Sequence, residues 1–230
     1  MMRAAREATL YAHFRDVFDR KIAEFPLAFA QLQELDEAAK RSTAAAFEIY
    51  DRFIRANQLG NTPSDLQEQY LVRELILLQK IFSANEAVEM LRQAISIFGG
   101  HGVMEDFSSL PRLLRDAMVN ELWEGPKNVL LTQIYRDLQK MKEWYPVKKF
   151  VADLLPDSEQ NRIDKYTLEL QNLLETPLNG EINNHNVAHA KQWEAFCQAI
   201  FYDYQMQVMK KIDDLPILEN YTLQLKSAVK

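Results

Sequence analysis

The sequence has one cysteine and few residues that break helices, with six glycines and eight prolines among 230 residues. A single thiol, Cys197, cannot form a disulfide within the chain, which excludes a disulfide-stapled secreted domain and favours a reducing compartment. Scarce glycine and proline, between long stretches rich in Leu, Ala, Glu, Gln and Lys, favour helix over sheet. The composition therefore predicts an all-α protein located in the cytoplasm.

Excess positive charge and long apolar runs are also missing. The formal net charge of -6 opposes a general nucleic-acid-binding role, because phosphate binding needs a concentrated positive face. No apolar run approaches the roughly 20 residues that span a bilayer, and no signal-peptide core follows the first residues. We therefore expect neither nucleic acid nor a membrane among the partners.

Apolar residues recur at helical spacing through the first two thirds of the chain. Because each apolar stripe needs a partner, consecutive helices joined by short turns predict an up-and-down four-helix bundle over residues 1 to 145. In its first helix, Leu10, Phe14, Val17 and Phe18 share one face, opposite the arginines. The expected helices cover residues 3–19, 26–58, 63–98, 109–120 and 126–144.

Residues 146 to 230 differ in composition, with prolines and a polar tract from 179 to 184 that punctuate two further helices. We expect these helices near 157–175 and 185–213, as a helical appendage. The second has an apolar face that could dock on the bundle or on another subunit: Trp193, Phe196, Ile200, Tyr204 and Val208. His185 and His189 have the spacing of a metal clamp but no third ligand nearby, so we expect no metal.

Three short motifs carry the chemistry: the turn Gly99-Gly100-His101-Gly102, the run Arg112-Leu113-Leu114-Arg115-Asp116-Ala117 and the corner Trp123-Glu124-Gly125. Glycines at a helix end permit positive φ and close approach of a ligand to the backbone, although most only terminate helices. Likewise, Glu124 alone is explained by the favourable interaction of an acid with a helix start.

Together these motifs resemble the carboxyl-terminal signature of acyl-CoA dehydrogenases, which has a Gln-x-x-Gly-Gly-x-Gly turn, an Arg-x-x-Arg-Asp-Ala helix and an aromatic-Glu-Gly corner. A second patch, Tyr11-Ala12 with Arg15, Phe18 and Ile22, is similar to the family's Tyr-Ala-x-x-Arg-x-x-Phe-Gly-x-x-Ile. The resemblance covers about residues 3 to 145. It implies the family's helical carboxyl-terminal domain, without the amino-terminal helical and middle β-domains that complete the active site.

The resemblance further implies α,β-dehydrogenation of an acyl-CoA thioester by FAD. Glu124 would be the base that removes the α-proton, and Gly125 would lie beside the substrate thioester. The family forms homo-oligomers, dimers or tetramers, that share flavin sites between subunits, and electron-transfer flavoprotein is a partner that it implies. The residues that would contact FAD are Arg15, Phe18, Ser96, Gly99, Gly100 and Asn128.

Two alternatives stay open. Ser96 stands where the family usually has a flavin-contacting Gln, and Pro126 stands where a hydroxyl residue usually contacts FAD. These departures favour a non-catalytic helical oligomerisation module derived from the family. A relative of the family's adaptive-response branch, linked to nucleic-acid protection, is the third reading, and the acidic charge balance opposes it.

Overall fold

The computed structural model describes residues 1–178 and 180–213, and this part of the chain is built almost entirely from helices. Its fold class is all-α, as the sequence predicts. Two very short strands and two 3-10 helices, η1 and η2, accompany the α-helices. In chain order the elements are α1 (Met2–Phe14), β1 (Asp16–Val17), β2 (Arg20–Lys21), η1 (Ile22–Glu24), α2 (Pro26–Ala56), α3 (Pro63–Phe98), η2 (Gly99–Val103), α4 (Leu110–Asn120), α5 (Lys127–Met141), α6 (Val147–Leu154), α7 (Gln160–Glu175) and α8 (Asn184–Asp213).

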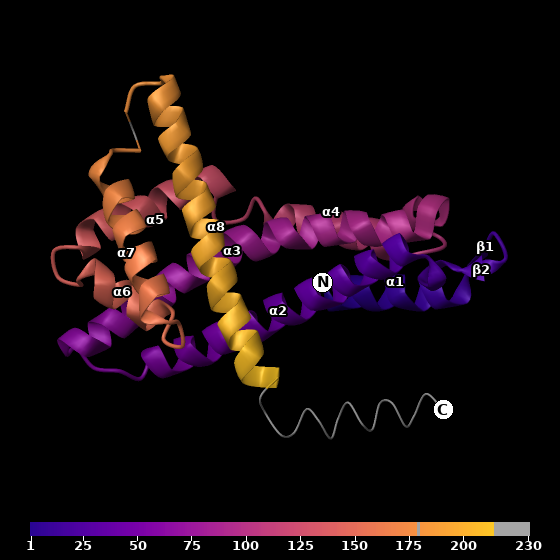
Figure 1. The fold of residues 1–230 in the computed structure, drawn as a ribbon, viewed down its shortest axis with the longest axis horizontal. Coiled ribbons are helices and arrows are strands. Elements are labelled where there is room, and N and C mark those ends of the chain that lie inside the picture. Colours follow the sequence, from indigo (N-terminus) through magenta and orange to yellow (C-terminus); the bar gives the residue numbers. More distant parts are fainter. Residues whose placement is uncertain (179, 214–230) are drawn as a thin grey trace.

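The two longest helices, α2 and α3, pack against each other and run along the length of the molecule (Figure 1). Local signals in the sequence fix their ends. Thr62 and Asp65 form a capping box, in which the hydroxyl of Thr62 accepts from the Asp65 N–H and the Asp65 carboxylate accepts from the Thr62 N–H. At its other end α3 terminates at Gly99, whose φ of 60° is readily available to glycine. The long helices therefore begin and end close to their predicted limits.

Buried apolar side chains form two clusters, one at each end of the α2–α3 pair. The smaller cluster joins α1, the first half of α2, the second half of α3, and α4. The larger cluster joins the remaining halves of α2 and α3 to α5, α6, α7 and α8. Since the larger cluster contains residues from both sides of residue 145, the predicted division into residues 1–145 and 146–230 stays a prediction.

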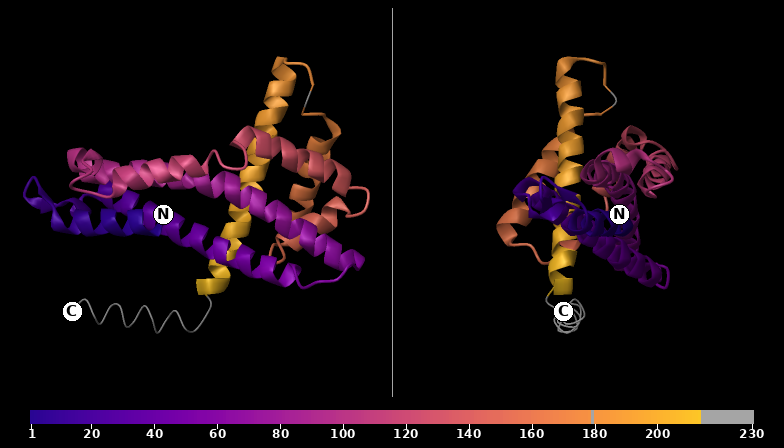
Figure 2. Two further views of the ribbon diagram at one scale, coloured as in Figure 1. Left: turned by 180° about the vertical axis from the view of Figure 1, so that it is seen from behind. Right: turned by 90° about the vertical axis from the view of Figure 1, so that its right-hand side faces the viewer.

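Helix α8 crosses the long helices and closes the larger cluster (Figure 2). Its predicted apolar face is buried, with no more than 4% of any of the five side chains exposed: Trp193, Phe196, Ile200, Tyr204 and Val208. The face docks on the same chain. Helix α6 is absent from the predicted helices, although its buried residues recur at helical spacing: Val147, Phe150, Val151 and Leu154. At eight residues it is shorter than the stretches over which this spacing distinguishes a helix.

The prediction of one helix over residues 3–19 is wrong beyond Phe14. There the chain leaves the helix and forms a two-stranded antiparallel hairpin, in which Asp16 pairs with Lys21. Phe18 and Asp19 form its tip with φ of 51° and 61°. Two consecutive positive φ angles are typical of the type I′ turn, whose twist matches that of paired strands. The tip contains no glycine, the usual sign of such a turn, so its sequence gives little warning.

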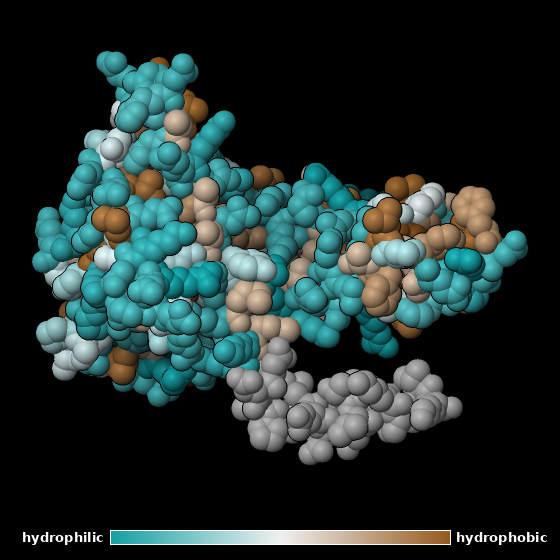
Figure 3. Space-filling model, in the orientation of Figure 1, coloured by the Kyte–Doolittle hydropathy of each residue, from teal (hydrophilic) through white to brown (hydrophobic). Residues whose placement is uncertain are grey.

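The predicted inner face of α1 is also wrong. Its buried residues are small apart from one tyrosine: Ala4, Ala5, Ala8, Tyr11 and Ala12. Leu10, Phe14 and Phe18, which the apolar pattern groups together, are 60%, 77% and 86% exposed. Alanines allow the α1 backbone to approach its neighbours closely, and the larger side chains lie on the outside at the hairpin end of the bundle. Apolar side chains are visible on the surface at this end (Figure 3).

Candidate functional site

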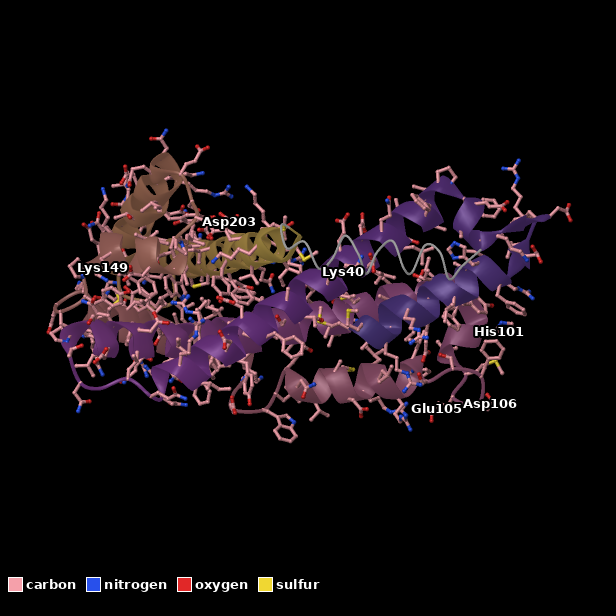
Figure 4. The ribbon with its side chains drawn as sticks, turned by 90° about the horizontal axis from the view of Figure 1, so that it is seen from below. Lys40, His101, Glu105, Asp106, Lys149 and Asp203 are labelled. Carbon is pink, nitrogen blue, oxygen red and sulfur yellow. The ribbon has the colours of Figure 1, made fainter. Side chains whose placement is uncertain are left out.

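An aromatic cluster ties α1 to the glycine-containing turn η2. The hydroxyl of Tyr11 lies 2.9 Å from Nδ1 of His101, and the Tyr11 ring stacks on Phe98 with centroids 4.1 Å apart. His101 in turn stacks on Phe107 at 4.3 Å. Figure 4 shows His101 at the end of the molecule remote from Lys149. The cluster brings the Tyr11-Ala12 patch and the Gly99–Gly102 turn to one end of the bundle, since Tyr11 belongs to the patch and His101 to the turn.

The turn after α3 uses its glycines in three different ways. Gly99 supplies a positive φ of 60°. Gly102 is buried, and an added Cβ there would lie 2.6 Å from the carbonyl oxygen of Ile95, so this glycine is needed for packing. Beside Gly100, nothing lies within 4 Å of an added Cβ. Gly100 thus presents bare backbone that a ligand can approach.

The other residues predicted to contact flavin at this end are also exposed. Arg15 directly follows α1, Phe18 is at the hairpin tip, and Ser96 is in the last turn of α3. The carbonyl oxygen of Ser96 accepts the N–H of Gly99. These three side chains and the Gly99-Gly100 backbone therefore offer a cation, a phenyl ring, a hydroxyl and an open stretch of main chain.

Charged side chains also lie at this end, where Arg115 of α4 donates to Glu105 at 2.6 Å. The guanidinium lowers the pKa of the Glu105 carboxyl through this hydrogen bond and through its charge. Both groups are exposed, so the pair is screened by water and contributes little to stability.

The Trp123-Glu124-Gly125 motif forms a sharp corner between α4 and α5. Glu124 has φ of 61° and Gly125 has φ of 119°, before Pro126 caps the start of α5. A positive φ is uncommon for a residue with a side chain, and such backbone strain is found preferentially at functional sites. Glu124 is exposed, and its neighbours Leu122 and Trp123 are 66% and 64% exposed. The corner therefore presents a carboxylate beside an uncovered apolar surface.

Side chains of α3 hold the corner on its α4 side. Nζ of Lys80 donates to the carbonyl oxygen of Asn120 at 2.5 Å, and Nδ2 of Asn85 donates to Oε1 of Glu121 at 3.0 Å. A cavity of about 220 Å³ lies between α3 and the corner. The sequence does not mark these anchors, because polar residues on a helix surface have no periodic signal that distinguishes anchors from solvated side chains.

The predicted site residues thus form two groups, one at each of two positions along α3. Lys80 marks the corner and Gly99 marks the turn, and 19 residues at about 1.5 Å per residue separate them by roughly 28 Å. The turn group comprises Arg15, Phe18, Ser96, Gly99 and Gly100. The corner group comprises Glu124, Gly125 and Asn128, the last of which is exposed in the first turn of α5.

Within residues 1–178 and 180–213, no group of three or more His, Cys, Asp and Glu side chains is arranged to hold a metal ion. His185 is exposed, whereas His189 is buried and its Nε2 has no hydrogen-bond partner in this part of the chain. None of the helices described is both long and apolar enough to cross a membrane.

Comparison with known proteins gives matches to acyl-CoA dehydrogenases and their relatives. The family model for the acyl-CoA dehydrogenase C-terminal domain matches residues 1–139. Acyl-CoA dehydrogenase family member 11 of Caenorhabditis elegans is 34% identical over 136 residues, 59% of this chain and 21% of that protein. The structure of C. elegans ACDH-11 in complex with C11-CoA has a TM-score of 0.61 at 20% identity, covering 90% of this chain and 36% of that one. Acyl-CoA dehydrogenase complexed with FAD from Bacillus anthracis has a TM-score of 0.55 at 17% identity, covering 97% of this chain and 48% of that one.

These matches differ in extent. The chain spans about a fifth of the length of the curated C. elegans relative. The family model ends at residue 139, whereas the structural similarity covers 90% or more of the chain and so extends beyond α5. At 20% and 17% identity the structural similarity concerns the fold alone.

Proposed function

Since the chain belongs to the acyl-CoA dehydrogenase family, as its C-terminal helical domain, we propose that it supplies the catalytic base and part of a flavin site to an acyl-CoA dehydrogenase. The reaction is α,β-dehydrogenation of an acyl-CoA thioester. In it, Glu124 removes the α-proton and Gly125 lies beside the thioester. FAD, when bound beside the substrate, would supply the hydride acceptor for the β-hydrogen. An electron-transfer flavoprotein is the proposed partner that would accept the electrons.

The strained backbone at Glu124 is the observation that best supports this role. A glutamate held at φ of 61° presents its carboxylate at an exposed corner, next to Leu122 and Trp123. A general base must lie within hydrogen-bond reach of the proton that it removes, so its backbone has to be fixed. The two apolar side chains would exclude water from a bound acyl chain. The strain thereby serves to place one carboxylate against the substrate.

The turn group has the chemistry that a flavin dinucleotide requires. Arg15 offers a guanidinium for phosphate, Phe18 offers an aromatic face, and Ser96 offers a hydroxyl. At Gly99 and Gly100 the exposed main chain allows close approach of a flat or anionic group. In the corner group, Asn128 adds an exposed amide in the first turn of α5. These residues fit the cofactor, and we propose that they hold it.

The distance between the groups supports a site shared between subunits. Roughly 28 Å along α3 separates the corner from the turn, at about 1.5 Å per residue. In a homo-oligomer, the corner of one subunit can meet the turn of its partner, so that each chain contributes to two sites. The exposed apolar side chains at the hairpin end, such as Phe14 and Phe18, would then be covered by the partner.

The experiment is a Glu124→Gln substitution in the full-length protein, followed by absorbance spectroscopy of the bound flavin on addition of acyl-CoA thioesters. We expect wild-type flavin to bleach and the variant to stay yellow, because an amide cannot accept the α-proton. Glu143→Gln, the same change at an exposed glutamate beyond α5, is the matched control and should bleach normally. Bleaching by the Glu124 variant would eliminate Glu124 as the base.

The second candidate function is a non-catalytic helical oligomerisation module. It is favoured by the exposure of Phe14, Phe18 and Val103 at the hairpin end, which are 77%, 86% and 66% exposed. Such a module would associate through this end without binding flavin. A full-length protein that is colourless and stays colourless with added FAD would support the module over the enzyme.

A further inference from the structure

We propose that α8 is a positioning element for catalysis, holding the start of α5 and thereby fixing Glu124 at the corner. The inference rests on the proposed role of Glu124 as base. It assigns a function to a helix that lies outside residues 1–139, the part matched by the family model.

The first tie between α8 and α5 is a buried tryptophan. Trp193 is 1% exposed, and its indole N–H donates to the carbonyl oxygen of Leu131 at 3.0 Å. Its ring meets that of Tyr135 edge to face, with centroids 5.3 Å apart. Because Leu131 and Tyr135 lie one turn apart, the tryptophan contacts two successive turns of α5. A buried aromatic ring with its N–H satisfied is a rigid anchor.

The second tie lies at the first residue of α5. Nζ of Lys127 is 2.6 Å from Oε1 of Glu194, the residue that follows the buried tryptophan. The two side chains are 46% and 39% exposed, so the pair contributes little to overall stability. Lys127 is three residues from Glu124, however, and the ion pair restrains the chain where it leaves the corner.

The corner is thus held from both sides. Lys80 and Asn85 of α3 hold its α4 side, and α8 holds its α5 side. Between these anchors Glu124 keeps its positive φ. A displacement of about 1 Å in a catalytic group can lower a rate by about 100-fold, so loss of one anchor should affect turnover more than stability.

The test uses charge swaps in the full-length protein. Lys127→Glu and Glu194→Lys are made singly and together, and kcat, KM, and hydrogen exchange of the backbone amides at residues 121–125 are measured. The matched control is the same charge swap at an ion pair between α6 and α7, with Lys148→Asp and Asp164→Lys made together. These two charged groups are 2.8 Å apart, and their side chains are 61% and 50% exposed. Trp193→Phe removes the indole N–H while keeping an aromatic ring in the core.

We expect each single charge variant to lower kcat about tenfold, with KM changed less than about threefold, and to speed exchange at the corner. The double swap should restore kcat to within about threefold, and the Lys148/Asp164 swap should leave it unchanged. Trp193→Phe should lower kcat as well. Normal kcat in the single variants would overturn the inference, as would a double swap that fails to restore it.

The outcomes also separate this inference from the proposed function. If Glu124→Gln abolishes flavin reduction while Lys127→Glu and Glu194→Lys do not change it, only the positioning role of α8 fails. If Glu124→Gln retains full activity, both fail, because there is then no base at the corner to position.

Discussion

Glu74 gives the sharpest prediction about stability, because it is a carboxyl group inside the larger core. It is 1% exposed, and its Oε1 accepts a hydrogen bond from Arg73 at 3.2 Å. Its Oε2 has no hydrogen-bond partner among the described residues. Burial first, and then the negative charge of Asp137, raise the pKa of Glu74 to about 8, against the opposing effect of Arg73. We predict that Glu74→Gln stabilises the protein above neutral pH.

The direction follows from the protons bound in each state. Below pH 4.5 the carboxyl is protonated in the folded and the unfolded chain, and its stabilising contribution is complete. Between pH 4.5 and about 8 the unfolded chain loses the proton while the folded chain retains it, so stability falls as the pH rises. At about 1.4 kcal/mol per pKa unit, this rise in pKa corresponds to a loss of at most about 5 kcal/mol. Glutamine cannot ionise, so the variant avoids the loss.

The assay is urea unfolding of wild type and Glu74→Gln at intervals from pH 5 to pH 9. The free energy of unfolding of the variant minus that of wild type should grow by about 3 to 5 kcal/mol across this range. The contributions of the other titrating groups are common to both proteins and cancel in this difference. Glu143→Gln, at an exposed position, should alter stability by less than about 0.5 kcal/mol. A difference between Glu74→Gln and wild type that stays constant with pH would refute the reasoning.

Two further changes test the packing of each end by urea unfolding. Gly102→Ala should lower the free energy of unfolding by about 2 to 4 kcal/mol, because the added Cβ would lie 2.6 Å from the Ile95 carbonyl oxygen. Gly100→Ala, with open space beside it, should lower it by less than about 1 kcal/mol, and equal losses would contradict the packing role of Gly102. Asp203→Ala should lower the free energy of unfolding by about 2 to 4 kcal/mol. Asp203 accepts hydrogen bonds from Arg162 at 2.7 Å and from Tyr166 at 2.6 Å, and the buried tyrosine hydroxyl would lose its partner. A loss below about 0.5 kcal/mol would show that this network contributes little.

Local sequence signals were sufficient for the long helices and for the family. Proline at the first position of α2 and α3, and the Thr62–Asp65 capping box, act within one turn of chain, so they fix helix ends before any tertiary contact forms. The motifs around Gly99 and Glu124 were recognisable by residue order alone. The family-model match over residues 1–139 confirms that recognition.

The pattern of apolar residues was not sufficient where neighbours decide the fold. The apolar pattern predicts that Leu10 and Phe14 face inward, yet both are exposed, and the inner face of α1 consists of four alanines and Tyr11. The hairpin tip at Phe18 and Asp19 has no glycine to mark it. Periodicity identifies an amphipathic helix, but the space available between packed helices determines which face is buried.

The amino-acid sequence by itself determined the helical class, the ends of the long helices and the identity of the motif residues, because these depend on propensity, capping and residue order. Tertiary structure alone decided that the corner at Glu124 lies beside Lys80, at a position on α3 remote from Gly99, and that Trp193 contacts Leu131, 62 residues away in the chain. Such contacts depend on how whole helices pack, and no local pattern specifies them. The site residues could therefore be identified from the sequence, but their division into two groups and the support of the corner by α8 could not.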